Sequence, residues 1–257
     1  MQLDLDGKVV VLSGASGGIG ATIARQFLAQ GCKVALLARD ADRLERTLKK
    51  LGSDFDPQNI ISISVDCSIE KDLTEAIFTI VKTWSKIDIT IANIGDGRSE
   101  QIAIPSSESF KYAFESNFET AVNLARATQD ELHKSHGNLL FISSIAGLEV
   151  MGAPTDYSIA KAAVVMLAKQ LSHKLAPEIR VNCIAPGNIL FAGGRWEELM
   201  KSNSESVKAM IKESVPLQRF GSPEDVASVA VFLCSPRAAF ITGTCLTVDG
   251  GQTTASH

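Results

Sequence analysis

Short runs of consecutive apolar residues recur along the chain, spaced so that a helix fits between one run and the next. Seven of them have the length of strands, at residues 8–13, 33–38, 60–65, 87–92, 138–144, 179–185 and 244–248. Runs that are apolar at nearly every position are typical of parallel strands covered on both faces. The pattern therefore predicts seven buried parallel strands.

The segments between these runs carry apolar residues at helical spacing. Helices are predicted over residues 21–31, 40–51, 107–134 and 222–233, and from residues 69 and 157 onward. Alternating strands and helices with right-handed crossovers predict an α/β protein with a Rossmann-type, doubly wound, seven-stranded parallel sheet and helices on both faces. No linker, repeat or low-complexity run divides the chain, so residues 1–257 are interpreted as one dinucleotide-binding catalytic domain.

A glycine-rich turn, S-G-A-S-G-G-I-G, follows the first predicted strand and leads into a helix. Glycines allow a close approach of the backbone to a diphosphate, and the helix amino terminus offers free N–H groups to it. The alternative is an ordinary glycine-rich turn. The strand, turn and helix in this order favour a dinucleotide site, and its candidate cofactor residues are Gly14, Ser16, Gly18, Ile19 and Gly20.

The residue after the second strand bears on the choice of cofactor. An NAD site usually has an acidic residue there for the ribose hydroxyls, but this chain has Ala38 followed by Arg39. A guanidinium suits a 2′-phosphate, so NADP(H) is favoured over NAD(H). The alternative is that Arg39 pairs with Asp40 or Asp42 on the surface.

The ends of the other strands supply further candidate cofactor residues, because ligands bind at the carboxyl ends of such sheets. They are Asp66, Cys67, Asn93, Gly95, Pro186, Gly187 and Ile189. The carboxylate of Asp66 can contact the adenine amino group, or it can cap the helix that starts near residue 69.

A serine, a tyrosine and a lysine form the candidate catalytic group. Ser144 ends the fifth strand, and Lys161 follows Tyr157 by four residues, which puts the two on one helical face with β-carbons roughly 5–6 Å apart. A cation beside a phenol favours the phenolate, so the pair is expected to exchange a proton closer to neutrality. Taken singly, these residues are more often a turn serine and a packed ring beside a solvated amine. Asn117, inside a long helix, is either a tolerated polar residue or a water-binding site where the helix opens locally.

Two segments indicate a subunit interface and a substrate lid. Residues 162–168, AAVVMLA, are apolar all round the helix, and a partner subunit is the economical cover for them, so we expect a homo-oligomer, a tetramer or a dimer. Residues 188–215 hold glycines followed by an amphipathic pattern interrupted near residues 202–204. They are a candidate substrate lid, or equally an ordinary amphipathic surface helix.

Charge and composition narrow the function. The net charge of −4 gives no basic footprint for nucleic acid or an anionic membrane. No apolar run reaches the roughly 18 residues of a membrane span, and the first residues are not those of a signal peptide, so a cytoplasmic location is expected. The five cysteines are scattered and predicted to be reduced, and no His/Cys spacing indicates a metal site.

These motifs together resemble those of the short-chain dehydrogenase/reductase family, over nearly the whole chain. The resemblance rests on the glycine turn, Ala92 to Gly95 in place of N-N-A-G, Asn117, Ser144, Tyr157, Lys161, Pro186-Gly187, and the closing PLQRFGSPEDVA and ITGTCLTVDGG. It implies a nicotinamide cofactor and usually a homotetramer. The closing motifs are similar to those of 3-oxoacyl-thioester reductases, and they recur in sugar, steroid and polyol dehydrogenases.

The resemblance also implies a role for each catalytic residue. Tyr157 is implied to be the general acid in carbonyl reduction and the base in alcohol oxidation, and Ser144 to hold the carbonyl oxygen. Lys161 is implied to lower the pKa of Tyr157 and bind the nicotinamide ribose, and Asn117 to position a water that relays protons. Phe191 departs from the family pattern, because a threonine often stands there.

The expected function is therefore hydride transfer between NADP(H) and a small-molecule carbonyl or secondary alcohol. A 3-oxoacyl-thioester and a sugar or polyol are alternative substrates, and a non-catalytic NADP-binding sensor or scaffold is the alternative of another class. Asp96, Arg98, Glu100 and Arg195 hint at a polar or anionic substrate, although surface charges that never touch ligand explain them equally well.

Overall fold

A parallel sheet of seven strands runs through the middle of the protein, in a computed structural model that describes residues 2–255. The strands lie in the order β3-β2-β1-β4-β5-β6-β7, and all pair in parallel. Their bounds are β1 Val9–Ser13, β2 Lys33–Ala38, β3 Ile60–Ser64, β4 Ile89–Ala92, β5 Asn138–Ile142, β6 Arg180–Pro186 and β7 Cys245–Val248. The predicted fold class and all seven strands are confirmed.

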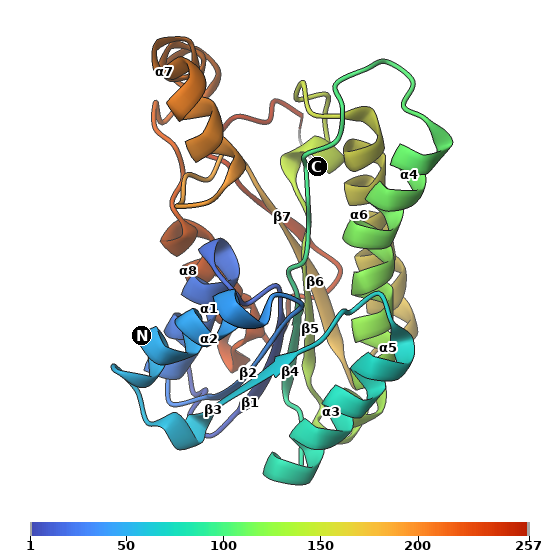
Figure 1. Cartoon of the computed structure of the whole chain (residues 1–257). Helices are drawn as coiled ribbons and strands as arrows, with labels where there is room; N and C mark the ends of the chain where they lie inside the picture. The colour runs from blue at the N-terminus through green and yellow to red at the C-terminus, as the bar shows by residue number, and fades with distance from the viewer. Residues whose placement is uncertain (1, 256–257) are drawn as a thin grey trace.

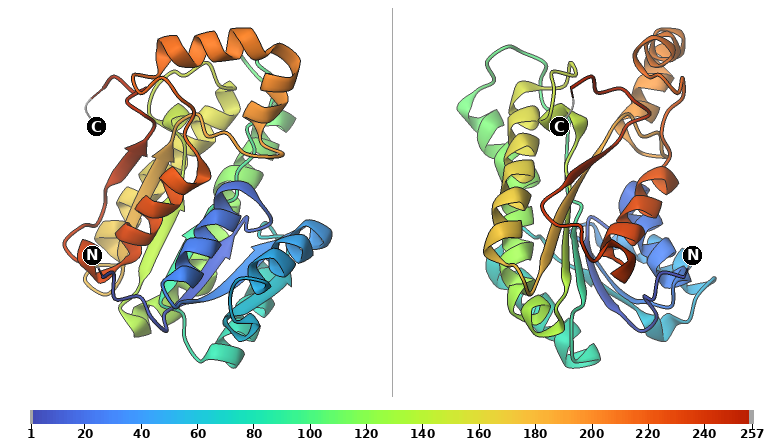
Figure 2. Two further views of the ribbon diagram at one scale, coloured as in Figure 1. Left: turned by 90° about the vertical axis from the view of Figure 1, so that its left-hand side faces the viewer. Right: turned by 180° about the vertical axis from the view of Figure 1, so that it is seen from behind.

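Helices cover both faces of this sheet (Figure 1). On one face lie α1 (Gly18–Ala29), α2 (Ala41–Gly52) and α8 (Pro223–Cys234). On the other lie α3 (Glu70–Trp84), α4 (Ser107–Phe114), α5 (Thr120–Ser135) and α6 (Thr155–Lys174). The view from behind shows the same two layers with the sheet between them (Figure 2).

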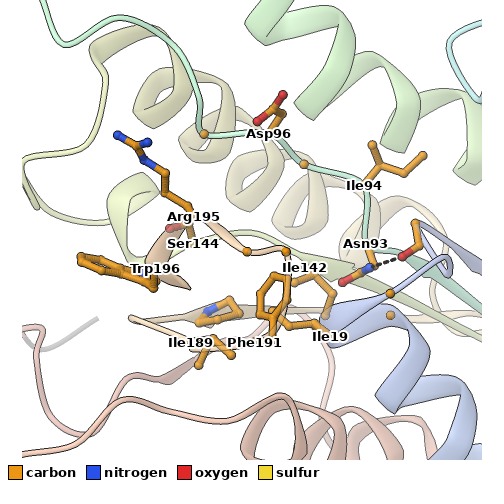
Figure 3. Close-up of a pocket in the computed structure, with 18 of the residues that line it drawn as sticks. Ile19, Asn93, Ile94, Asp96, Ile142, Ser144, Ile189, Phe191, Arg195 and Trp196 are labelled. Carbon is orange, nitrogen blue, oxygen red and sulfur yellow. Dashed lines mark hydrogen bonds between the residues drawn. The ribbon is translucent and has the colours of Figure 1, made fainter. Parts of the chain in front are cut away.

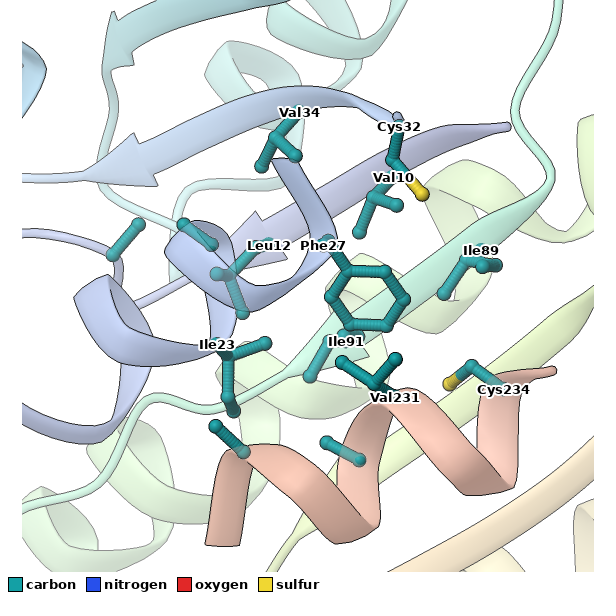
Figure 4. Close-up of a cluster of buried hydrophobic side chains, with 14 of the residues drawn as sticks. Val10, Leu12, Ile23, Phe27, Cys32, Val34, Ile89, Ile91, Val231 and Cys234 are labelled. Atoms are coloured by element: carbon teal, nitrogen blue, oxygen red, sulfur yellow. The ribbon is translucent and has the colours of Figure 1, made fainter. Parts of the chain in front are cut away.

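Each face of the sheet has its own apolar core. Along β1, Val10 and Leu12 belong to the cluster under α1 and α8, whereas Val9 and Val11 belong to the cluster under α3, α5 and α6. Successive side chains of a strand point to opposite faces, so a strand buried on both sides must be apolar throughout. Figure 4 shows the first cluster, in which the fully buried Phe27 ring lies among side chains of β1, β4 and α8.

The predicted helix over residues 107–134 is two helices joined by a π-helical turn, Glu115–Glu119. Asn117 lies in this turn with its side chain fully buried. Of the two alternatives for Asn117, the structure therefore has the local opening of the helix. Such π-helical turns are frequent at functional sites.

The segment after β6 forms α7 (Arg195–Ser214), which stands above the carboxyl ends of the strands (Figure 1). Asn203 has non-helical backbone angles inside it, so the helix is kinked where the sequence pattern is interrupted. Among the described residues, no helix is both long and apolar enough to cross a membrane.

Candidate active site

The glycine-rich turn after β1 forms one wall of a cleft at the carboxyl ends of the strands. A Cβ atom on Gly20 would lie 2.2 Å from the carbonyl oxygen of Gly14, so no other residue fits there. Gly14 itself has φ +67°, the left-handed region that favours glycine. The backbone of this turn is therefore open to a close ligand, as a diphosphate requires.

Tyr157 and Lys161 lie on the first turns of α6, on the face that meets the sheet. The Nζ atom of Lys161 lies 5.9 Å from the centre of the Tyr157 ring. It donates hydrogen bonds to the carbonyl oxygens of Ile142 (3.2 Å) and Ile94 (3.4 Å). The side chain of Ser144 lines the same cavity and lies close enough to the phenol of Tyr157 to lower its pKa. The structure thus brings together three of the four predicted catalytic side chains around one cavity.

Burial sets the acidity of this pair. It lowers the pKa of the Lys161 ammonium to about 8. Burial also raises the pKa of Tyr157, and this effect is the largest. The neighbouring Ser144 side chain partly offsets the rise, whereas the charge of Asp96 adds to it. We expected the Lys161 cation to favour the Tyr157 phenolate, but the pKa of Tyr157 is raised in the protein without cofactor. The Lys161 ammonium donates to two carbonyl oxygens, and the burial of the phenol has the larger effect. The phenol is consequently protonated at neutral pH.

Asn117, the fourth predicted catalytic residue, contacts the backbone of the loop after β4. Its Oδ1 accepts a hydrogen bond from Asp96 N (2.9 Å), and its Nδ2 donates to Asp96 O (3.1 Å) and to Ala113 O (3.0 Å). It lies behind the cavity wall and does not line it. Its structural effect is to fix Asp96 next to Tyr157.

Two adjoining cavities, of about 370 and 290 Å³, form the cleft. Nearly all of the predicted cofactor residues line one or both: Gly14, Ser16, Ile19, Gly20, Arg39, Asp66, Cys67, Asn93, Gly95, Tyr157, Lys161, Pro186, Gly187 and Ile189. Gly18 is the exception, because the Phe191 ring covers it: a Cβ atom on Gly18 would lie 2.5 Å from Cε2 of Phe191. With Ser144 after β5, the cleft unites residues from the ends of six strands, β1 to β6.

Basic and acidic side chains line the far end of the cleft, in the smaller cavity. Asp40 accepts a hydrogen bond from Arg43 N as the N-cap of α2. The Asp66 carboxylate accepts hydrogen bonds from Ser68 N and Ser68 Oγ in the turn before α3. It does not cap α3, because the N-cap residue of that helix is Ile69. The hydrogen bond from Ser68 N lowers the pKa of Asp66, and the charge of Arg39 lowers it further. Arg39 is thus free of Asp40 and near Asp66.

Arg43 is a site residue that the sequence reasoning missed. A Cβ atom on Gly17 would lie 3.2 Å from its Nη2 atom, so its guanidinium stands against the glycine turn. Arg43 lines both cavities. The only signal in the sequence is its spacing of four from Arg39 across a helix start.

The segment after β6 closes one side of the larger cavity (Figure 3). Phe191 gathers with Ile19, Ile142 and Ile189 on an apolar side, whereas Arg195 and Trp196 approach from α7. The sequence singled out Ile19, Ile189, Phe191 and Arg195. The positions of Ile142 and Trp196 on the cavity wall were missed, since they depend on how the segment folds back. Among the described residues, no group of three or more His, Cys, Asp or Glu side chains is arranged to hold a metal ion.

A side-chain bridge ties this segment to the loop after β4. Arg98 donates from Nη2 to Glu198 Oε1 (2.8 Å) and to Gly193 O (3.3 Å), and from Nη1 to Asp96 Oδ1 (3.3 Å). Arg195 lies 3.7 Å from the other oxygen of Glu198. Two cations and two carboxylates therefore balance one another at the mouth of the cavity.

Sequence comparisons match the whole chain to known enzymes. The family described as enoyl-(acyl carrier protein) reductase matches residues 14–253. The peroxisomal 2,4-dienoyl-CoA reductase of Saccharomyces cerevisiae is 35% identical over 252 residues, which is 96% of this chain and 84% of the yeast protein.

Solved structures of similar fold hold nicotinamide cofactors. L-sorbose reductase from Gluconobacter frateurii, in complex with NADPH and L-sorbose, has a TM-score of 0.92 and 31% identity, and the match covers 100% of both chains. A 7α-hydroxysteroid dehydrogenase in complex with NADH and 7-oxo glycochenodeoxycholic acid has a TM-score of 0.87 and 30% identity, covering 97% of this chain and 96% of that one.

Proposed function

Because the chain belongs to the short-chain dehydrogenase/reductase family, we propose that it transfers hydride between NADP(H) and a small polar carbonyl or alcohol, with Tyr157 exchanging the proton. The observation that carries this proposal is the group formed by Tyr157, Lys161 and Ser144 beside the glycine turn in one cleft. The bound nicotinamide cofactor supplies the hydride.

Each side chain has a defined task in this reaction. The Tyr157 phenol, protonated at neutral pH, donates its proton to the carbonyl oxygen during reduction and takes it back during oxidation. Ser144, which lines the same cavity beside Tyr157, holds the same oxygen. The ammonium of Lys161 stabilises the phenolate that forms. Asn117 fixes the Asp96 loop, and we retain the hypothesis that its π-helical turn binds a proton-relaying water.

The residues of the cleft fit the two ends of the cofactor. Gly14 and Gly20 leave the backbone of the turn open to the diphosphate. We assign Lys161 to the nicotinamide end and Arg39 and Arg43 to the adenosine end. Asn93 lies beside the glycine turn, where its Nδ2 donates to Gly14 O (3.2 Å). Two guanidinium groups there favour NADP(H), because they neutralise a 2′-phosphate that NAD(H) lacks.

We predict that Arg39→Asp weakens NADPH binding by about tenfold to a hundredfold, the value of one or two charge-assisted hydrogen bonds, and leaves NADH binding nearly unchanged. Titration by energy transfer from Trp196, which lines the cavity, measures both affinities. Arg46→Asp is the matched control, since Arg46 lies on the same helix α2 outside the cleft. Tighter binding of NADH than of NADPH by the unmodified protein would refute this part of the proposal.

The pH dependence follows from Lys161, whose pKa of about 8 lies below that of a free lysine. Below that pH the side chain is charged and supports the forming phenolate; above it the charge is lost. We therefore expect the rate of carbonyl reduction at saturating NADPH to be level at lower pH and to fall as pH rises through about 8. A reduction rate that stays constant to about pH 10, near the pKa of a free lysine, would contradict this role.

A sugar-like ketone or polyol is the substrate class that we favour. The charges of Asp96, Arg98, Arg195 and Glu198 at the cavity mouth cancel, so the mouth offers many hydrogen-bonding groups without a net charge. L-sorbose reductase, whose structure holds such a ketose, supports this choice. A panel that compares ketoses with 3-oxoacyl-thioesters by NADPH oxidation tests it, and exclusive use of thioesters would refute it.

We further propose that residues 188–215 act as a lid and that the protein is a cytoplasmic homo-oligomer. Trp196 and Phe191 line the cavity, and the Arg98–Glu198 bridge links this segment to the facing loop. On α6, Ile159 and Met166 are 44% and 59% exposed, which leaves apolar surface for a second subunit to cover. Five free thiols suit a reducing compartment.

A further inference from the structure

Cys183 and Cys245 lie opposite each other on the neighbouring strands β6 and β7. Paired positions of parallel strands point to the same face of the sheet and lie about 4.8 Å apart. That separation falls within the roughly 4.4–6.8 Å range of Cα distances found in disulfides. Both side chains pack in the apolar cluster under α3, α5 and α6, and both thiols are free. The backbone therefore already holds this pair at bonding range.

An oxidant can reach one member of the pair. β7 is the edge strand of the sheet, at the margin of the molecule in the left view of Figure 2. Cys245 is partly exposed, whereas the other four cysteines are buried. Cys183, with no exposed surface, is reachable only through Cys245. The exposed thiol would react first and the buried one second.

The two thiols also differ in acidity. Their mutual interaction lowers the pKa of Cys245 and is the main cause that raises the pKa of Cys183. A thiol with a lowered pKa is more often ionised, and the thiolate is the form that attacks an oxidant. Cys245 is thus the attacking residue and Cys183 the resolving one.

We propose that Cys183 and Cys245 form a reversible disulfide when the protein meets hydrogen peroxide. The Cys245 thiolate attacks one peroxide oxygen and breaks the O–O bond, giving a sulfenic acid and hydroxide, which becomes water with the proton that Cys245 gave up. The Cys183 sulfur then attacks the sulfenic sulfur; the S–O bond breaks, and the hydroxyl leaves as water with the Cys183 proton. Two thiols are oxidised and one peroxide is reduced to two waters.

We expect the disulfide to alter the active site through the packing of α6. Cys183 packs in the same apolar cluster as Val164 and Ala168 of α6, the helix that carries Tyr157 and Lys161. A covalent bond between Cys183 and Cys245 changes the surface on which α6 rests, so oxidation should lower turnover. The disulfide itself does not depend on the proposed function; only the turnover measurement does.

The remaining buried cysteines provide a comparison. Cys32 donates to the carbonyl oxygen of Leu5 (3.2 Å), and Cys234 lies at the end of α8. Their sulfur atoms are well separated in Figure 4. A variant that lacks Cys234 therefore loses a thiol without losing the proposed bond.

The test is to expose the full chain to hydrogen peroxide, block the remaining thiols, and map its peptides without reduction. We expect free thiols to fall from five to three, with one linked peptide that joins Cys183 to Cys245. Cys245→Ser should keep all four of its thiols, whereas Cys234→Ser should fall from four to two. Overoxidised Cys245 without a linked peptide, or a link between two copies of the chain, would overturn the proposal.

Turnover is measured on the same samples. We expect the oxidised protein to lose activity, a dithiol reductant to restore it, and Cys245→Ser to keep its activity under peroxide. A linked peptide with unchanged turnover would overturn the effect on the active site. If the unoxidised protein turns over no carbonyl substrate, the proposed function fails while the peptide map still decides the disulfide.

Discussion

Replacing Tyr157 by phenylalanine should lower turnover by about 10²–10⁴, the usual contribution of a positioned general acid or base, while NADPH still binds. The substitution removes only the hydroxyl beside Ser144 and leaves the ring in place. Stopped-flow or steady-state NADPH oxidation measures the loss, and fluorescence titration of the same sample measures cofactor binding.

The chain offers a matched control, because its only other tyrosine is Tyr112. Tyr112 donates a hydrogen bond to Asp96 Oδ2 (3.1 Å) and lies on α4, so Tyr112→Phe removes a hydroxyl from the same neighbourhood. We expect Tyr112→Phe to change turnover several-fold at most. Unchanged turnover in Tyr157→Phe would exclude Tyr157 as the proton donor and would favour a non-catalytic sensor or scaffold.

The second large effect is expected for Lys161→Met, which removes the ammonium but keeps most of the volume of a fully buried side chain. Loss of the charge that stabilises the forming phenolate should lower turnover by about 10²–10³. The fall of the reduction rate near pH 8 should disappear, because its titrating group is gone. The pH profile separates this role from a merely structural one.

Lys169 is the control for this variant. It lies two turns further along α6, and its Nζ donates to Gly243 O (3.0 Å) away from the cleft. Lys169→Met should therefore keep both the rate and the pH profile of the unmodified protein. If Lys161→Met retains a rate that still declines near pH 8, another group titrates there and the role given to Lys161 is wrong.

The sequence was sufficient for the features that local pattern determines. Apolar runs identified all seven strands, because the inner strands are buried on both faces and the edge strands β3 and β7 keep mostly apolar residues. The interruption at residues 202–204 marked the kink at Asn203, and the position of Asn117 marked the π-helical turn. Motif spacing placed Ser144, Tyr157 and Lys161 around one cavity, because strand ends and the first turn of the next helix meet there.

What the sequence missed depends on contacts between distant segments. Arg43 reaches the glycine turn only because α2 packs beside it, and Phe191 covers Gly18 only because the segment after β6 folds back. The pKa of Tyr157 was misjudged for the same reason: the burial of the phenol and the carbonyl partners of Lys161 are properties of the folded chain.

The most direct test of hydride transfer by this site uses NADPH deuterated at the transferring position of the nicotinamide. The protein is incubated with this cofactor and L-sorbose, and the alcohol product is analysed by mass spectrometry. We predict one deuterium on the former carbonyl carbon, formed at least about a hundred times more slowly by Tyr157→Phe. Product without deuterium, or labelled product formed equally fast by Tyr157→Phe, would contradict the account.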